Sequence, residues 1–153
     1  MRKVVLTLFA AMSCSVAFAS PSNAVYDATC GLCHQAAGAG LQGQFPRLAG
    51  RVDRMAGQAK SREFLIQTVL HGMAGRIEVD GAAIVGVMPP FASLPDRDLA
   101  SVLNYLVALG GSGAKQLKPI TTAEISTVRK APPLSATQVL QRRNALAAAG
   151  SIP

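Results

Sequence analysis

Residues 30–34 have the sequence Cys30-Gly31-Leu32-Cys33-His34. Two cysteines separated by two residues and followed directly by a histidine form the attachment signature for c-type haem. The chemistry explains the spacing, because two thiols must add to the two vinyl groups of one porphyrin while the next imidazole reaches the iron. On a helical turn, this offset places both sulfurs along one side. The motif predicts one covalently attached haem c, with Cys30 and Cys33 as its links and His34 as an axial iron ligand.

A redox disulfide and a structural zinc site are the alternatives for this motif. A thioredoxin-like disulfide needs a strand before the cysteines and a βαβ pattern around them, whereas residues 22–34 have the pattern of a short helix. A structural zinc site needs four ligands, and beyond the motif the chain offers only one further histidine, His71. Haem attachment is therefore the favoured interpretation.

The second axial ligand must come from a methionine or histidine beyond the motif; the candidates are Met55, Met73, Met88 and His71. Met88 is the strongest, because Pro89 and Pro90 restrict the backbone beside it and lower the entropy cost of fixing a thioether. We expect residues 87–91 to form an extended loop that holds Met88 without a helix or strand. The other two methionines are expected to be packing residues, and the histidine is expected to lie at a helix end.

Apolar periodicity, caps and turn residues place the other elements along the chain. They predict a helix over 61–70 ending at Gly72, and strands over 76–80 and 82–87 around an Asp80-Gly81 turn. A long helix is predicted from Leu94-Pro95-Asp96 to Gly110. Two shorter helices follow, one opened by a capping box at Thr121 and Glu124 and one over 135–149. Residues 38–50 are predicted to form a loop.

Several separate motifs, in order, resemble the class I cytochromes c over residues 22–110. They are Cys30, Cys33 and His34, then Gln44 to Gly50, Val87 to Phe91, Leu94 to Asp96, and Asn104 to Leu106. The resemblance implies an all-α fold with few helices around one covalently bound haem. To this the pattern of the chain adds a small β-hairpin insertion and a C-terminal extension.

The resemblance also implies roles for residues outside the haem-attachment motif. The Pro46 carbonyl would accept a hydrogen bond from the imidazole of His34 and orient it. Leu48 would pack against the haem. The apolar residues near Met88 in the sequence, Phe91 among them, are separately expected to exclude water around it. Two aromatic residues, Tyr26 and Tyr105, would meet where the first and last core helices cross.

The start of the chain has the three parts of a secretory signal. Met1-Arg2-Lys3 is basic, residues 4–19 are apolar, and Ala17-Phe18-Ala19 provides small residues before a cut. We therefore expect residues 1–19 to be a cleaved signal peptide and the protein to be periplasmic. An uncleaved anchor is the alternative, although the apolar run is short for a membrane span.

The basic charge lies at the C-terminal end of the chain. Residues 20–110, the expected cytochrome c domain, carry seven basic and seven acidic side chains, whereas residues 111–153 carry six basic side chains and only Glu124. A neutral exported domain argues against nucleic-acid binding. We expect this C-terminal extension either to wrap around the domain or to stay partly mobile. Its basic charge would contact an acidic partner or, peripherally, an anionic membrane, or it would simply be solvated.

A His/Met pair fills both axial positions of the iron and leaves no open site for a substrate. The chain is therefore expected to be an electron carrier and not an enzyme, either a free shuttle or the cytochrome subunit of a periplasmic complex. Its partners would be redox proteins such as a periplasmic dehydrogenase, reductase or terminal oxidase, and Arg47, Arg51 and Arg54 could guide docking or pair with the haem propionates. The alternative is a gas-binding sensor or small haem enzyme with a labile sixth ligand.

Overall fold

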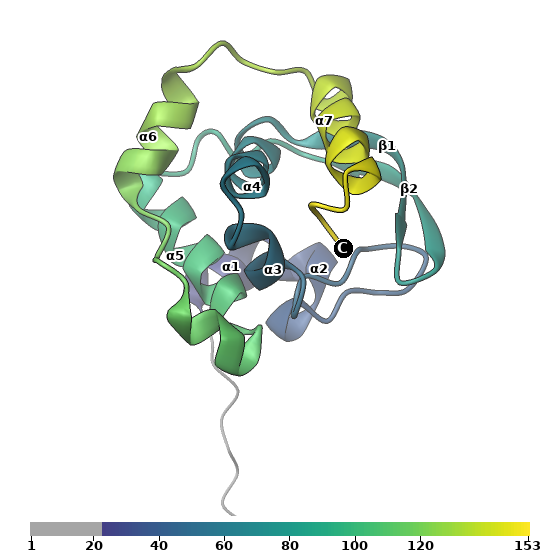
Figure 1. Cartoon of the computed structure of the whole chain (residues 1–153), viewed down its shortest axis with the longest axis horizontal. Helices are drawn as coiled ribbons and strands as arrows, with labels where there is room; N and C mark the ends of the chain where they lie inside the picture. The colour runs from purple at the N-terminus through teal and green to yellow at the C-terminus, as the bar shows by residue number, and fades with distance from the viewer. Residues whose placement is uncertain (1–22) are drawn as a thin grey trace, which may run out of the picture.

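A computed structural model describes residues 23–153 of the chain (Figure 1). The described part is mostly helical, with one small antiparallel sheet. The predicted signal peptide, residues 1–19, lies outside the described residues. The elements, in chain order, are α1 (Ala24–Thr29), α2 (Gly31–His34), η1 (Ala36–Gly38), α3 (Val52–Ala56), α4 (Ala59–His71), β1 (Met73–Val79), β2 (Ala82–Met88), α5 (Asp96–Ala108), η2 (Gly111–Gln116), α6 (Thr122–Lys130) and α7 (Ala136–Ala148).

The hydrophobic core lies between α3, α4 and α5, and α1 packs across α5. The apolar stripe predicted for α5 is buried, with Leu99, Val102 and Leu103 each at most 2% exposed. Helices α1 and α5 cross where Tyr26 and Tyr105 meet, with ring centroids 5.1 Å apart and ring planes tilted by 50°. This crossing fixes the start of the motif-bearing segment against the core.

The predicted hairpin is confirmed, and it is longer than expected. Asp80 and Gly81 both have positive φ, 53° and 75°, as a two-residue turn of this kind requires. The prediction that Val87 and Met88 lie in a loop is wrong, because β2 continues through Met88, which pairs with Met73. The reason is that Met88 keeps its backbone N–H, and only Pro89 removes a donor from the ladder.

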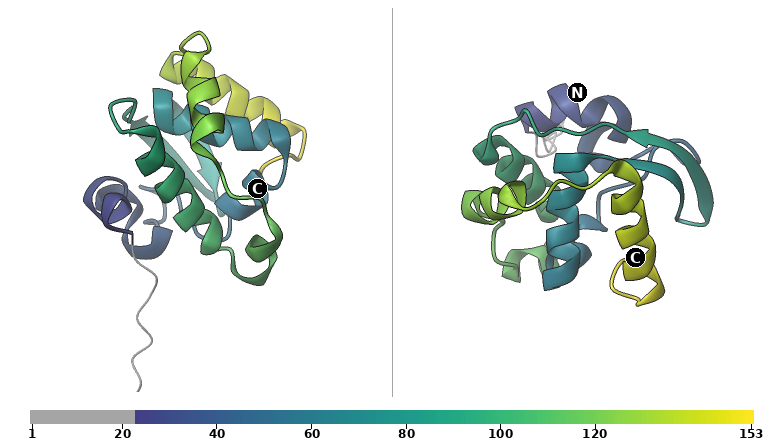
Figure 2. Two further views of the ribbon diagram at one scale, coloured as in Figure 1. Left: turned by 90° about the vertical axis from the view of Figure 1, so that its left-hand side faces the viewer. Right: turned by 90° about the horizontal axis from the view of Figure 1, so that it is seen from above.

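The C-terminal segment wraps around the molecule as an ordered part of it. Helix α6 packs on α4 and α5, and α7 packs on α4 and β1 (Figures 1 and 2). Ile125 and Val139 anchor these helices with side chains that are 0% exposed. Both helices begin with a capping box, as predicted for the first of them. Of the two alternatives for this segment, the structure favours wrapping over a mobile tail.

Several of the basic side chains of this segment are used inside the molecule. Arg129 pairs with Asp96 at 2.8 Å and also donates to the carbonyls of Ala92 and Leu94. Arg142 lies 3.6 Å from a carboxylate oxygen of Glu63. The excess charge of residues 111–153 is therefore partly neutralised by the domain that they cover.

We predict that Glu124 links the stability of this C-terminal segment to pH. Two hydrogen bonds from Arg62, 2.6 and 3.0 Å long, and further bonds from Thr121 lower the pKa of Glu124 from 4.5 to about 2. The pair therefore stabilises the fold fully above the unfolded pKa, and this stability is lost as the pH falls from about 4.5 through 2. Glu124→Gln should lower the free energy of unfolding by about 1 kcal/mol at pH 7, since the carboxylate is partly exposed.

Urea denaturation of the unmodified protein and of Glu124→Gln at pH 7 and pH 2.5 would measure the difference in their free energies of unfolding, which should be smaller at pH 2.5. Glu78→Gln is the matched control, because Glu78 makes only an exposed pair with Arg76 at 3.6 Å. An equal loss of stability in both variants at pH 7 would show that Glu124 has no special role.

Candidate functional site

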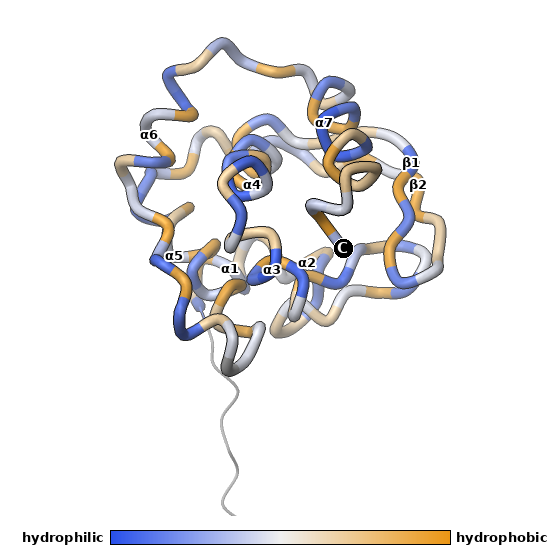
Figure 3. The backbone as a smooth tube through the Cα atoms, in the orientation of Figure 1, coloured by the Kyte–Doolittle hydropathy of each residue, from blue (hydrophilic) through white to orange (hydrophobic). Residues whose placement is uncertain are grey.

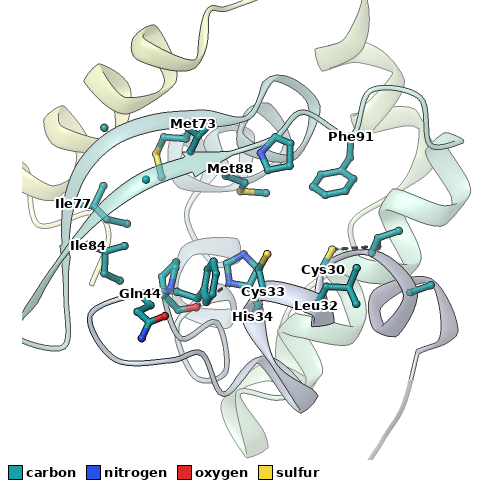
Figure 4. Close-up of a pocket in the computed structure, with 18 residues that line it drawn as sticks. Cys30, Leu32, Cys33, His34, Gln44, Met73, Ile77, Ile84, Met88 and Phe91 are labelled. Atoms are coloured by element: carbon teal, nitrogen blue, oxygen red, sulfur yellow. Dashed lines mark hydrogen bonds between the residues drawn. The ribbon is translucent and has the colours of Figure 1, made fainter.

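A cavity of about 450 Å³ opens between the Cys30–His34 motif and the hairpin (Figure 4). Helix α2 and the residue before it supply Cys30, Cys33 and His34 on one wall. The end of the hairpin supplies Met73 and Met88 on the facing wall. The remaining lining is largely apolar and includes Leu32, Phe45, Ile77, Ile84, Val87 and Phe91. Charged and apolar residues alternate over residues 76–79 of β1, whereas β2 contains no charged residue (Figure 3). The hairpin side chains that line the cavity are Met73, Ile77, Ile84, Val87 and Met88.

Both cysteines of the motif line the cavity as free thiols. Cys30 is half-buried and Cys33 is exposed. Burial raises the pKa of the Cys30 thiol, and a hydrogen bond with Thr29, 3.4 Å between Oγ1 and Sγ, partly opposes that shift. The two thiols face a space that an apolar, planar group could occupy beside them.

His34 is buried, and its ring orientation is fixed by one hydrogen bond. Its Nδ1 lies 2.9 Å from the carbonyl oxygen of Pro46. Because a carbonyl can only accept, Nδ1 carries the proton and Nε2 keeps its lone pair. Burial lowers the pKa of His34, so the ring is neutral near pH 7. A neutral imidazole with a free Nε2 and a bonded Nδ1 is the form that binds a metal ion.

Met88 is held at the end of β2 by contacts on both sides of it. Pro89 and Pro90 follow it, and the backbone N–H of Phe91 donates to the carbonyl of Val69 at 2.8 Å. Gly72, at the end of α4, lies against this segment so closely that an added Cβ would collide with the carbonyl oxygen of Met88. The methionine is therefore fixed by its backbone, facing the wall that holds His34 (Figure 4).

Met73 is a residue whose position sequence reasoning missed. We expected a packing residue, and it does pack against the hairpin cluster. It also pairs directly with Met88 across the ladder and lines the same cavity. The signal was present in the sequence, because residues counted outward from the Asp80-Gly81 turn bring these two methionines opposite each other.

The other predicted residues divide between this cavity and a smaller one of about 120 Å³ beside it. Phe91 lines the first, Leu48 the second, and Pro46 lines both. Arg47 and Arg51 also line the smaller cavity, whereas Arg54 donates to the carbonyl of Gly50 at 2.9 Å and lines neither cavity.

The two remaining candidates for the axial ligand lie away from the facing walls of the larger cavity. Met55 lines only the smaller cavity, and His71 lies at the end of α4 and lines neither cavity. Three residues of the C-terminal segment reach the smaller cavity without any signal in the sequence, and they are Arg143, Ile152 and Pro153.

The donor set fits a haem c better than a free metal ion. Within residues 23–153, no group of three His, Cys, Asp or Glu side chains is placed to hold a metal ion. This argues against the zinc alternative, which needs four converging ligands. Two thiols on one edge, an imidazole behind them and a thioether on the facing wall of an apolar cavity match a covalently attached haem with two axial ligands.

None of the helices between residues 23 and 153 combines the length and apolar character needed to cross a bilayer.

Comparison with known proteins gives three matches. A family model described as "Cytochrome C oxidase, cbb3-type, subunit III" matches residues 18–106. A protein named Cytochrome c-552 from Thermus thermophilus is 40% identical over 133 residues, which cover 86% of this chain and 89% of that protein. A second Cytochrome c-552 from Thermus thermophilus is 41% identical over 121 residues, 78% of this chain and 92% of its own length. The longer match extends past residue 110 into the C-terminal segment.

Proposed function

This chain belongs to the class I c-type cytochromes, and we propose that it carries single electrons between redox proteins of the bacterial periplasm. Its cofactor is a covalently bound haem c, and its activity is electron transfer. In our proposal, one haem is attached to Cys30 and Cys33, with His34 and Met88 as axial ligands. We base this assignment on one observation, which is that His34 and Met88 lie on facing walls of a single apolar cavity.

A haem c bound in this cavity supplies an iron that accepts and releases one electron. The chain's own residues keep the ligands in place while this happens. Pro46 fixes the imidazole of His34 through the 2.9 Å bond to Nδ1. Pro89 and Pro90 fix the backbone that carries Met88. Ligands that keep their positions in both oxidation states make the reorganisation energy small, and a small reorganisation energy favours fast electron transfer.

The apolar rim of the cavity supports an electron exit on this face of the molecule. Leu32 and Val87 both line the cavity, yet they are 74% and 75% exposed. Val85 lies on β2 beside the cavity but is not one of its lining residues, and it is also 74% exposed. Large apolar side chains left in water beside a cofactor cavity fit a surface that a redox partner covers briefly. A periplasmic dehydrogenase, reductase or terminal oxidase would be such a partner.

The choice between a free shuttle and a subunit of a complex needs a test that leaves the core intact. Deleting residues 111–153 would remove Ile125 and Val139 from the interior, so lost binding would not isolate a partner role. A better test replaces three exposed lysines of this segment, Lys115, Lys118 and Lys130, with uncharged residues. If a complex co-purifies with the unmodified protein and not with this variant, the C-terminal segment binds a partner.

An electrochemical titration of the exported protein tests the proposed function. We expect a single wave with the slope of a one-electron couple, and we expect the ferrous protein to bind carbon monoxide very slowly or not at all. The reason is that two protein ligands leave no open position on the iron. Rapid, stoichiometric binding of carbon monoxide would contradict the proposal and favour a gas sensor or a small haem enzyme.

A further inference from the structure

The smaller cavity is lined by three arginines, although its other walls are largely apolar. They are Arg47, Arg51 and Arg143. The cavity shares several wall residues with the larger one, which include Cys30, His34, Pro46, Met73, Ile77 and Met88. No aspartate or glutamate is found among the described residues that line either of these two cavities. The combined space is therefore apolar around the motif and cationic at one end.

The positive charge at this end is only partly balanced by the protein. Asp80 accepts from Arg47 at 2.9 and 3.0 Å and also from Arg51 at 3.1 Å, so one carboxylate serves two guanidinium groups. Arg51 is only 9% exposed, and its other bond, 2.5 Å long, is to the main-chain oxygen of Pro153.

Arg143, on α7, adds the third cation beside this pair. It is half-buried, and it donates to the backbone carbonyl of Glu78 at 2.8 Å. Within residues 23–153 it forms no ion pair with a carboxylate. Burial, and next the positive charge of Arg51, lower the pKa of Arg143. A guanidinium has five donors, and buried cations without an anion are costly, so this end of the cavity is built to receive anionic groups.

We propose that Arg51 and Arg143 bind the two propionate carboxylates of the haem, which makes α7 and the last residues of the chain part of the cofactor site. This inference rests on the haem attachment proposed above. The chain's end is held in place for this role, because Ser61 donates to the carbonyl of Ser151 at 2.8 Å and Ile152 is buried. The C-terminal segment then acts on the cofactor of its own chain, whether or not it also binds a partner.

The test is the reduction potential of the haem-loaded protein carrying Arg143→Gln, compared with Arg142→Gln. Arg142 is the preceding residue on α7, its side chain is 49% exposed, and it pairs with Glu63 at the surface, so the control makes the same change in charge outside the cavity. Loss of a cation beside the propionates favours the ferric state. We expect Arg143→Gln to lower the equilibrium constant for reduction by a common donor about fivefold to tenfold, and Arg142→Gln to leave it nearly unchanged.

Arg143→Lys supplies a second measurement in a protein that keeps the charge. Resonance Raman bands of the propionate groups should shift in this variant, because a lysine cannot make the bidentate contact of a guanidinium. Equal potentials in the two glutamine variants, or unchanged propionate bands in Arg143→Lys, would overturn the inference. These outcomes leave the proposed function intact, whereas an unmodified protein without covalent haem would contradict the function itself.

Discussion

Replacing Met88 with alanine is expected to abolish the ferric absorption band that arises from charge transfer between methionine sulfur and iron. The variant should also lose on the order of 0.1–0.3 V of reduction potential, a fraction of the ~0.8 V range that axial ligands cover. A thioether favours the ferrous state, and alanine at the end of β2 leaves that position to water or another weak ligand. Optical spectra of both oxidation states and voltammetry would measure the two effects.

Met73→Ala is the matched control for this experiment. It removes the same side chain from the paired position of the same hairpin and from the wall of the same cavity. We expect its charge-transfer band to persist, because Met88 and the two prolines that fix it are unchanged. Loss of the band in Met73→Ala and its survival in Met88→Ala would exchange the roles of the two methionines.

The part of the site that lies close together in the sequence could be predicted from it. Cys30, Cys33 and His34 form one local motif, and its chemistry fixes their order and spacing. The structure adds the Pro46 bond to His34, which the resemblance implied and the 2.9 Å distance supports. The covalent and axial roles of these residues stay predictions until the haem-loaded protein is measured.

The register of the hairpin could be predicted only in part. The Asp80-Gly81 turn identified both strands, yet the two prolines after Met88 suggested that the strand had already ended. The ladder continues to Met88 because a proline removes the donor of its own residue and not that of the residue before it. The first strand was also predicted to begin at residue 76, whereas β1 begins at Met73, and these two errors together hid the pairing of Met88 with Met73.

The path of the C-terminal segment could not be predicted from local patterns. Its helices were visible from their caps and periodicity, but their position depends on contacts between distant residues. Arg62 pairs with Glu124, and Arg51 donates to Pro153. Hydrophobic periodicity does not reveal such pairs, so the sequence left both a wrapped segment and a mobile tail open. The role of Arg143 depends entirely on this path.

Replacing Gly72 with alanine is expected to disturb the methionine from a position that does not touch the cavity. Gly72 has φ 72°, and an added Cβ would collide with the Met88 carbonyl oxygen and lie 3.0 Å from the Pro90 nitrogen. Two costs add here, about 1 kcal/mol for a side chain at φ 72° and ψ −177°, a conformation nearly restricted to glycine, and about 2 kcal/mol for moving a packed segment. We expect a loss of about 3 kcal/mol in the free energy of unfolding, together with a weaker charge-transfer band.

Gly43→Ala separates these two costs. Gly43 has φ 74°, nearly the same φ as Gly72, but an added Cβ there would meet nothing within 4 Å. This control should lose only the backbone cost and keep the full band, as measured by urea denaturation and optical spectroscopy of the ferric protein. Equal stabilities and equal bands in the two variants would mean that the segment after β2 can move without affecting the ligand. A larger loss confined to Gly72→Ala would instead mean that close packing against the end of α4 keeps Met88 in position.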